Sequence, residues 1–243
     1  MSDFSGAGDI DASLALLWGM HEPPTRGRKP NVTLDQIVTT AVEIADAEGL
    51  DAVSMRRIAS ELGLGTMSLY RHVPGKSELL DLMLDRVNAP RKPGSQGGWK
   101  ARLRECAYGF YELYTSHPWL LQVDQSRPLL GPNTMAGLEA IMGGLSDLPM
   151  TDQHKMIVVI SLDSLVTGIA RQEINAVRAV ERTGVTDEQF WAAQAPVLEK
   201  AMSSGDYPVM GALDEDTFNL TWEDTMDLAV SAFIDGIERR LER

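Results

Sequence analysis

The sequence predicts an all-α protein with two helical domains, the first small and the second larger. Apolar residues recur at steps of three and four along much of the 243-residue chain, which is the spacing of helices with one buried face. No sustained alternation of apolar and polar residues indicates strands. The segment 89–98 is rich in proline and glycine and is predicted to link the two domains.

The first domain is predicted over residues 33–88 and consists of three to four helices. Thr33 and Gln36 have the spacing of a capping box, so a helix is expected to begin there and to end at Gly49. Ser54 is a favoured N-cap for a second, short helix. The helices expected in this domain cover about 33–48, 54–62, 66–73 and 76–88.

The second domain is predicted over residues 99–243 and contains fewer, longer helices. The longest, about 151–183, is apolar on more than one face, which predicts burial on several sides. A loop is expected at 203–216. The other helices expected here cover 99–116, 132–145, 187–202 and about 218 to the C-terminus, with a short helical turn at 118–123.

The composition is that of a globular protein outside the membrane. Hydrophobic residues make up 44% of the chain, which suffices for a core, and no apolar run approaches the roughly 18 residues that would span a bilayer. The single cysteine, Cys106, excludes an intrachain disulfide. We therefore expect a cytoplasmic protein.

The net charge of −13 is unevenly distributed along the chain. Residues 54–76 contain four basic residues and one acidic residue, and residues 23–32 contain three basic residues and no acidic one. Beyond residue 92, 22 acidic residues stand against 12 basic ones. Because local charge governs contact with phosphates, the first domain remains a candidate for binding nucleic acid.

Residues 54–73 have the pattern of a helix-turn-helix, since two short helices are joined by a tight turn that contains Gly63. In the second helix, Leu69 and Val73 lie one turn apart and suit the core. Lys76 begins the next helix, where backbone N–H groups and a cation can hold a phosphate. The remaining hydroxyl, aromatic, apolar and cationic side chains suit the bases and phosphates of double-stranded DNA. They belong to Thr66, Met67, Ser68, Tyr70, Arg71 and His72.

The stretch SMRRIASELGLGTMSLYRHVPGK (54–76) resembles the signature of the tetracycline-repressor (TetR) family almost from end to end. Residues of about 33–87 resemble the DNA-binding domain of that family. A looser resemblance to its regulatory domain includes HPWLL (117–121) and GPN (131–133). In the family, this second domain forms the dimer and holds a small-molecule effector.

The resemblance implies a role for each of the residues that are expected to contact DNA, which we call the reading surface. Arg56 would contact the DNA backbone or a base, and residues 66–68 would lie at the leading end of the recognition helix. Met67 stands where many relatives carry a small residue or proline, so it is a candidate for contact with a thymine methyl group. The positions at which the family holds phosphates are Tyr70, His72 and Lys76.

Several of these residues have a structural alternative. His72 could cap the short helix, and Tyr70 could be a packing residue. Arg56 and Arg57 could form a solvated face, and of the two we expect only Arg56 to contact DNA.

Residues 1–32 are predicted to be a flexible basic arm, because prolines and Gly27 oppose helix formation. Arg26, Arg28 and Lys29 precede the first DNA-binding helix directly, so the arm can reach the minor groove, whose negative potential attracts arginine. The alternative is a disordered leader that only improves solubility.

A dimer is expected because symmetric helix-turn-helix dimers bind pseudo-palindromic sites. In the last helix, Ala229, Ala232 and Gly236 are small enough to let two helices approach closely. Together with the helix 151–183, this helix is predicted to form a four-helix interface between two copies.

The other helices of the second domain are expected to enclose an apolar pocket for the effector. No metal site is expected, because His117 and His154 lack any paired metal-ligand spacing, and no cofactor is expected. The candidates for the pocket, chosen by residue type, are Tyr108, Tyr111, Trp119, Leu138, Met142, Leu162 and Phe190. The alternative for the four aromatic residues is that they belong to the core.

The sequence thus predicts a homodimeric repressor that binds a palindromic operator and is released by a small molecule. An enzyme is disfavoured, since no nucleophile elbow, phosphate loop or dinucleotide fingerprint is present. An architectural DNA-binding protein would be basic throughout. Activators use the same motif as repressors, so the sequence leaves that choice open.

Overall fold

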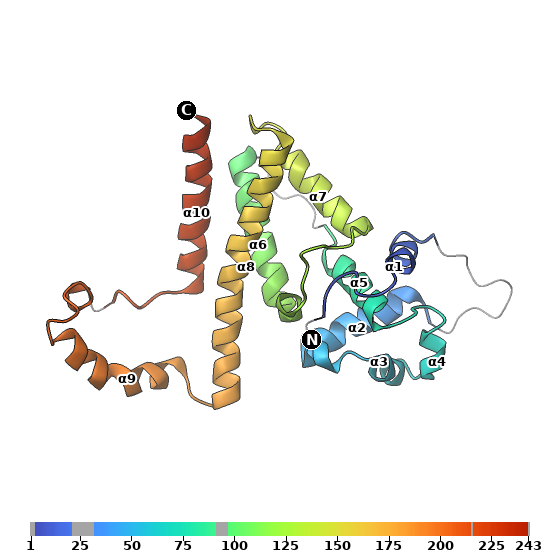
Figure 1. Cartoon of the computed structure of the whole chain (residues 1–243), viewed down its shortest axis with the longest axis horizontal. Coiled ribbons are helices and arrows are strands. Elements are labelled where there is room, and N and C mark those ends of the chain that lie inside the picture. The colour runs from blue at the N-terminus through green and yellow to red at the C-terminus, as the bar shows by residue number, and fades with distance from the viewer. Residues whose placement is uncertain (1–2, 21–31, 91–96, 215, 243) are drawn as a thin grey trace. The chain divides into compact units, whose positions relative to one another are not determined.

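The structure is a computed structural model that describes residues 3–20, 32–90, 97–214 and 216–242. Within these ranges the secondary structure is helical apart from one isolated β-bridge between Phe4 and Asp124, which confirms the predicted all-α class (Figure 1). The α-helices are α1 (Ile10–Leu17), α2 (Leu34–Glu48), α3 (Met55–Glu61), α4 (Thr66–Leu69), α5 (Lys76–Val87), α6 (Trp99–Ser116), α7 (Pro132–Gly144), α8 (Asp152–Thr183), α9 (Asp187–Met202) and α10 (Trp222–Leu241). Short 3-10 helices are η1 (Leu50–Ala52), η2 (Pro118–Gln122) and η3 (Met210–Ala212).

The chain divides into two compact units, one up to Asp163 and the other from Ser164 onward. The division falls inside α8, whereas the sequence predicts a boundary at 89–98. The helices on the two sides of that linker belong to one unit because α5 packs on α7 and α2 contacts η2.

Helices α2 and α3 begin where the sequence signals place them. The side chain of Thr33 accepts a hydrogen bond from the Gln36 amide and the Gln36 side chain accepts one from the Thr33 amide, so the capping box is present. The hydroxyl of Ser54 caps α3 by accepting from the Arg57 amide. Helix α4 ends at Leu69, earlier than predicted, and Tyr70 to His72 continue as a turn in which the His72 and Val73 amides donate to the Leu69 carbonyl.

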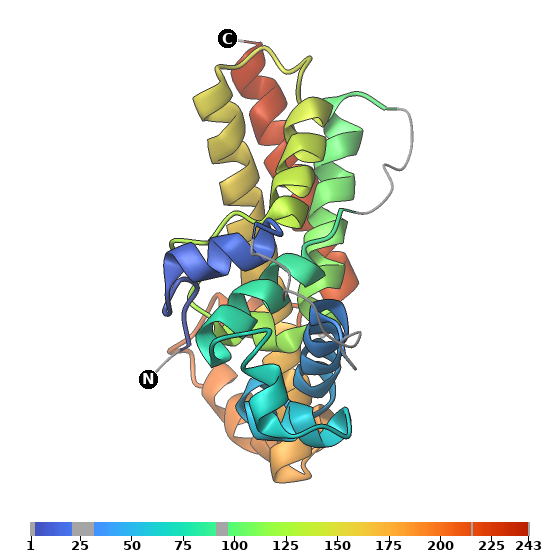
Figure 2. The same ribbon diagram turned by 90° about the vertical axis from the view of Figure 1, so that its right-hand side faces the viewer.

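The prediction of an irregular arm over residues 1–32 is wrong for residues 10–17, which form α1. Asp9 caps this helix by accepting from the Ala12 amide, and Leu17 is buried in the core. Helix α1 packs beside α5 (Figures 1 and 2). The helix-breaking prolines that favoured an irregular arm all come after α1, at positions 23 to 30. Residues 21–31 lie outside the described ranges.

The second unit contains the latter part of α8, then α9, η3 and α10. One face of α10 is buried and carries Met226, Val230, Ile234 and Ile237. Helix α9 presents large apolar side chains to the surface, among them Trp191. Among the described helices, none combines the length and apolar character needed to cross a membrane.

Candidate functional site

Helices α3 and α4 form the predicted helix-turn-helix. Gly63 takes a φ of 65° in the turn, a conformation that glycine adopts without strain, and the Leu64 amide donates to the Ala59 carbonyl at 2.8 Å. The side chains of Leu69 and Val73 are fully buried, as expected for the core face. The second helix is thereby fixed against the first, with its other faces turned away from the core.

The predicted reading residues lie on the outer faces of α4 and of the turn that follows it. Met67 is 73% exposed and Tyr70 is 45% exposed, and Arg71 is exposed as well. Thr66, Ser68 and His72 are half-buried. The surface therefore offers apolar, aromatic and cationic groups on one short helix and the turn that follows it.

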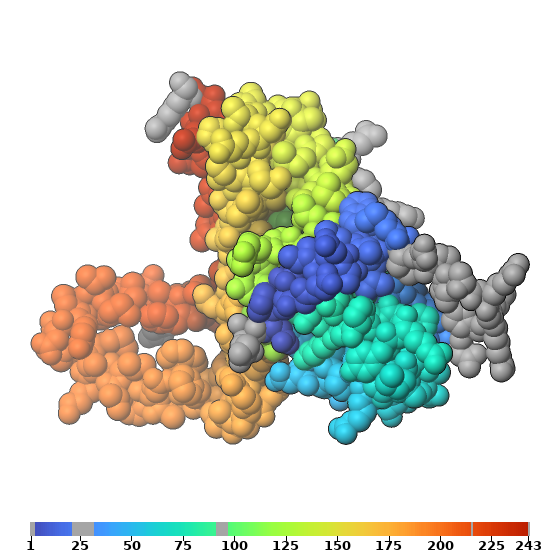
Figure 3. Space-filling model, turned by 45° about the vertical axis from the view of Figure 1, so that its right-hand side comes forward, coloured from blue at the N-terminus to red at the C-terminus, as the bar shows by residue number. Residues whose placement is uncertain are grey.

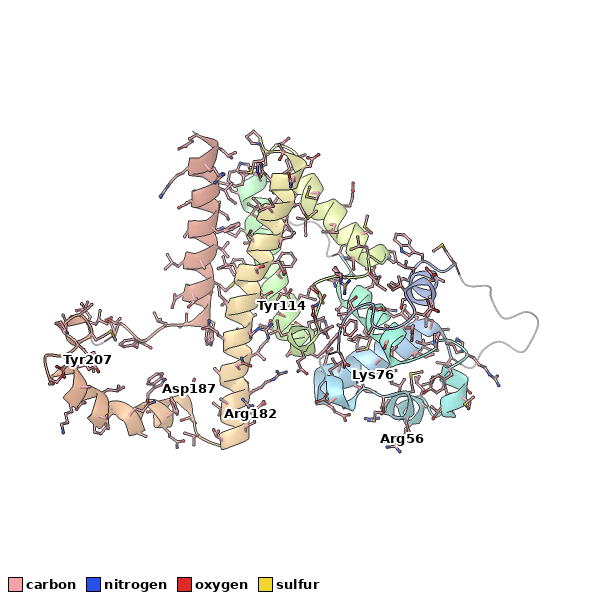
Figure 4. All side chains as sticks on the ribbon, viewed as in Figure 1. Arg56, Lys76, Tyr114, Arg182, Asp187 and Tyr207 are labelled. Carbon is pink, nitrogen blue, oxygen red and sulfur yellow. The ribbon has the colours of Figure 1, made fainter. Side chains whose placement is uncertain are left out.

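The two neighbouring arginines of α3 differ in their surroundings. Arg57 forms ion pairs with Glu48, at 2.8 Å, and with Glu61. The hydrogen bond to Glu61, followed by the hydrogen bond to Glu48, raises the pKa of the Arg57 guanidinium above its ordinary value. Arg56 is exposed on α3 (Figure 4), so its charge is the better placed of the two for DNA.

The remaining predicted DNA contacts are Lys76 and the basic arm. Lys76 is the first residue of α5, is half-buried and lies 3.4 Å from a carboxylate oxygen of Asp3. Arg26, Arg28 and Lys29 lie outside the described residues.

A pocket of about 770 Å³ lies between α6 and α7 and is also lined by residues 87–90, at the end of α5 and just after it. Of the residues predicted for the effector site, Tyr108 and Leu138 line it. Its apolar walls are interrupted by polar groups, which include the ion pair of Arg102 with Glu105 at 2.9 Å. A cavity of this size and mixed lining is typical of small-molecule sites.

Five of the residues predicted for the effector site do not line this pocket, because they were chosen by residue type alone. Trp119 is 1% exposed and belongs to the core, and Leu162 is also fully buried. Phe190 lies on α9 in the second unit and is 53% exposed. Tyr111 and Met142 are half-buried but are not among the lining residues.

The other residues of α6 that line the pocket could have been predicted from helical spacing, although not from residue type. Arg102, Cys106, Gly109, Leu113 and Ser116 recur at steps of three and four and all face the pocket. The face of the helix, more than the presence of aromatic rings, decides which side chains reach the cavity.

Two carboxylates, one on α2 and one on α5, contact residues that line the pocket. Asp46 of α2 places Oδ1 2.7 Å from Nδ1 of His117, a lining residue, and the same oxygen accepts the Trp119 indole N–H at 2.7 Å. Asp85 of α5 accepts from the amide and hydroxyl of Thr134, another lining residue, at 2.9 Å each. Direct hydrogen bonds therefore connect the pocket wall to α2 and α5, the helices that precede and follow the helix-turn-helix in the chain.

Burial dominates the electrostatics between α6 and α8. It raises the pKa of the Cys106 thiol to about 12, with smaller contributions from Asp163 and Glu105, so the thiol stays protonated at neutral pH. Burial also raises the pKa of the Asp163 carboxyl, against the opposing effect of the hydrogen bond that Tyr114 (labelled in Figure 4) donates at 2.8 Å.

Replacing Asp163 by asparagine is expected to stabilise the protein at neutral pH. The folded state holds the proton of Asp163 to a higher pH than the unfolded chain does, so wild-type stability falls as pH rises from the unfolded pKa to the raised folded one. Asparagine removes this loss and still accepts from Tyr114. Urea unfolding of both proteins at acidic and neutral pH measures the difference, and a variant less stable than wild type at neutral pH would contradict the expectation.

Comparison with known proteins agrees with this geometry. Residues 37–83 match the family described as "Bacterial regulatory proteins, tetR family", and residues 90–241 match the "Tetracyclin repressor-like, C-terminal domain". The chain is 50% identical over 240 residues to the HTH-type transcriptional repressor DrrR1 of Streptomyces coeruleorubidus, a match that covers 98% of this chain and 88% of the relative.

Solved structures show the same fold. The Streptomyces coelicolor TetR family protein ActR in complex with actinorhodin is 31% identical, with a TM-score of 0.66 over 86% of this chain and 97% of ActR. ActR in complex with (S)-DNPA gives a TM-score of 0.65 at 28% identity, over 87% of this chain and 99% of ActR. The chain therefore belongs to the tetR family of bacterial regulatory proteins, and it is a ligand-responsive transcriptional repressor.

Proposed function

We propose that this protein acts as a homodimer that binds a palindromic operator through α4 and releases it when a small molecule fills the pocket between α6 and α7. The observation that carries the DNA-binding role is the orientation of α4. Its Leu69 is locked in the core, while Met67 is exposed at the leading end of the helix. A short helix held in this way can enter the major groove without distorting its own support.

The contacts divide into base reading and phosphate binding. Residues Thr66, Met67 and Ser68 face the bases, and the cations around them hold the backbone, which supplies affinity without sequence preference. The proposed phosphate and backbone contacts are Arg56, Tyr70, Arg71, His72, Lys76 and, in the minor groove, Arg26, Arg28 and Lys29.

The dimer is supported by the two faces of α10. The face with Met226 and Val230 is buried within the chain, whereas Ala232 and Gly236 on another face are exposed and Leu228 is 73% exposed. A second copy that covers the exposed face would remove this apolar surface from water. Light scattering of the free protein measures the mass directly, and a monomer at micromolar concentration would contradict the dimer.

The effector is proposed to be a small molecule that fills the α6–α7 pocket, as actinorhodin is bound by ActR. Because Thr134 and His117 line the pocket and contact Asp85 and Asp46, the effector would favour a spacing of the reading helices that no longer fits the operator. We further propose that the protein works in the cytoplasm and acts by binding alone, without catalysis.

The proposed function is tested by footprinting the DNA upstream of the chain's own coding sequence. We expect a short, symmetric footprint that is lost when an effector from a metabolite and antibiotic panel is added, and reduced transcription from a promoter that overlaps it. Broad coverage would indicate an architectural protein instead, and increased transcription would indicate an activator.

Met67 is expected to read a thymine methyl group. Replacing Met67 by alanine removes this apolar contact and should weaken operator binding by about fivefold, the equivalent of about one buried methylene group. Substituting uracil for thymine in the operator removes the methyl group of the DNA and leaves the protein unchanged. Wild type should lose affinity at one symmetric pair of positions while the alanine variant does not, and equal losses for both proteins would contradict the contact.

A further inference from the structure

The N-terminal strap, which we define as residues 3–18, lies outside the region that matches the tetR family. It crosses α5, the helix that directly follows the recognition helix, and then continues into α1. Figure 3 shows this segment, in dark blue, lying between α5 and the chain that leads into α7. The strap is therefore well placed to act on the DNA-binding surface.

Buried carboxylates of α5 hold the strap. Asp81 is 3% exposed, and its two oxygens accept from the hydroxyl of Ser5 at 3.1 Å, the amide of Gly6 at 2.9 Å and the hydroxyl of Ser13 at 2.8 Å. Glu78, also buried, accepts from the Asp9 amide at 2.9 Å. Hydrogen bonds to a buried charge are among the stronger ones, and removing their donors is costly.

The approach of the strap to α5 is close enough to require glycine at position 8. A Cβ atom on Gly8 would lie 2.1 Å from Oε1 of Glu78 and 2.9 Å from the Cβ of Ser77. The backbone of the strap thus lies directly against the first turn of α5.

The other edge of the strap is held by the chain that precedes α7. Phe4 and Asp124 form a parallel bridge, in which the Asp124 amide donates to the Asp3 carbonyl at 3.0 Å and the Ser5 amide donates to the Asp124 carbonyl at 3.1 Å. The Trp18 indole N–H donates to the Leu130 carbonyl at 3.1 Å. Asp3 is therefore part of an anchored backbone and not of a free end.

This anchoring places the carboxylate of Asp3 3.4 Å from Nζ of Lys76. Both side chains are about two-fifths exposed, so the pair lies at the surface and the amine remains accessible. Lys76 is the residue for which a DNA phosphate is proposed. A phosphate that binds there has to compete with Asp3, and it meets a second negative charge beside its own site.

We propose that the strap lowers DNA affinity by holding Asp3 against Lys76, so that Asp3 is an affinity-setting residue of the reading surface. The proposal rests on the proposed function in one respect, the contact of Lys76 with a phosphate. An exposed ion pair contributes little by itself, so the effect is a tuning of affinity and not a block. Because Lys76 contacts the DNA backbone and not a base, Asp3 changes the affinity for every DNA sequence alike.

The test compares full-length variants on a duplex that carries the chain's own upstream region. Asp3→Asn should bind about two- to fivefold more tightly than wild type, the range expected for an exposed pair. Its affinity should fall more steeply with salt, by up to about 0.9 in the logarithmic slope, since Lys76 then neutralises one phosphate fully. Asp11→Asn, an exposed acid on α1 of the same strap, is the matched control and should leave affinity unchanged.

The variant Lys76→Met distinguishes the proposed phosphate contact of Lys76 from the proposed effect of the strap. It should weaken binding, and Asp3→Asn should have no further effect in its background. If Lys76→Met leaves affinity unchanged, the proposed phosphate contact is wrong. If it weakens binding but Asp3→Asn alone changes nothing, or if Asp11→Asn tightens binding equally, the role of the strap is wrong. Circular-dichroism melting of each variant establishes that it is folded.

Discussion

Replacing Trp119 by alanine is expected to lower the free energy of unfolding by about 3–5 kcal/mol, the range for removal of a fully buried large aromatic side chain. Trp119 is 1% exposed and is among the largest fully buried side chains of the described residues. The substitution leaves a cavity and also removes the indole N–H that donates to Asp46 at 2.7 Å. Because this bond joins η2 to α2, the loss falls at the contact between the first helix of the DNA-binding domain and the segment that follows α6.

Urea unfolding at a fixed protein concentration measures this loss, since the stability of a dimer depends on concentration. Trp119→Phe is the matched variant, because it keeps an aromatic ring and loses mainly the hydrogen bond. It should cost about 0.5–1.5 kcal/mol, the net value of one hydrogen bond, because the Asp46 oxygen still lies 2.7 Å from Nδ1 of His117. An alanine variant that loses less than the phenylalanine variant would show that the side chain is not a core residue.

Filling the pocket at Gly109 is expected to abolish the response to effector while operator binding persists. Gly109 lies in α6 and lines the pocket, and no atom beyond its chain neighbours and its own helix backbone lies within 4 Å of the position that a Cβ would take. Phenylalanine at this position would occupy space inside the cavity without a clash at its Cβ. Effector affinity should fall at least about tenfold, since a ligand would have to displace the ring or leave apolar area uncovered.

Gly109→Ala is the matched control for this substitution. It should raise the free energy of unfolding by about 0.5–1 kcal/mol, because alanine favours a helix over glycine, and it should leave most of the pocket open. The fluorescent probe 1-anilinonaphthalene-8-sulfonate reports occupancy by titration, and operator binding is measured separately. If the phenylalanine variant binds the probe as tightly as the alanine variant does, the α6–α7 cavity is not the binding site for such molecules.

Much of the fold could be predicted from local sequence because local interactions determine it. The capping box at Thr33, the cap at Ser54 and the left-handed turn at Gly63 each depend on a few neighbouring residues. The inward face of the recognition helix followed from the spacing of Leu69 and Val73, both of which are fully buried. The same spacing predicted which side chains of α4 point away from the core.

The lining of the α6–α7 pocket could be predicted only in part, because it depends on which face of α6 meets α7. Tyr108 and Leu138 line the pocket, but Trp119 does not, since its indole is used by Asp46. Aromatic residues are equally suited to a core and to a ligand site. Only the orientation of the helices distinguishes the two uses.

Local sequence was enough to predict an all-helical regulator with a helix-turn-helix at residues 54–73, since helix periodicity, caps and the recognition motif depend on adjacent residues. The roles of the acidic residues of α5 follow only from the folded arrangement. Glu78, Asp81 and Asp85 look like an ordinary solvated face in the sequence, yet all three are buried. Their hydrogen-bond donors come from the strap and from α7, roughly 50 to 75 residues away along the chain. Partners so distant in sequence leave no local pattern, so folding alone brings Asp3 to Lys76.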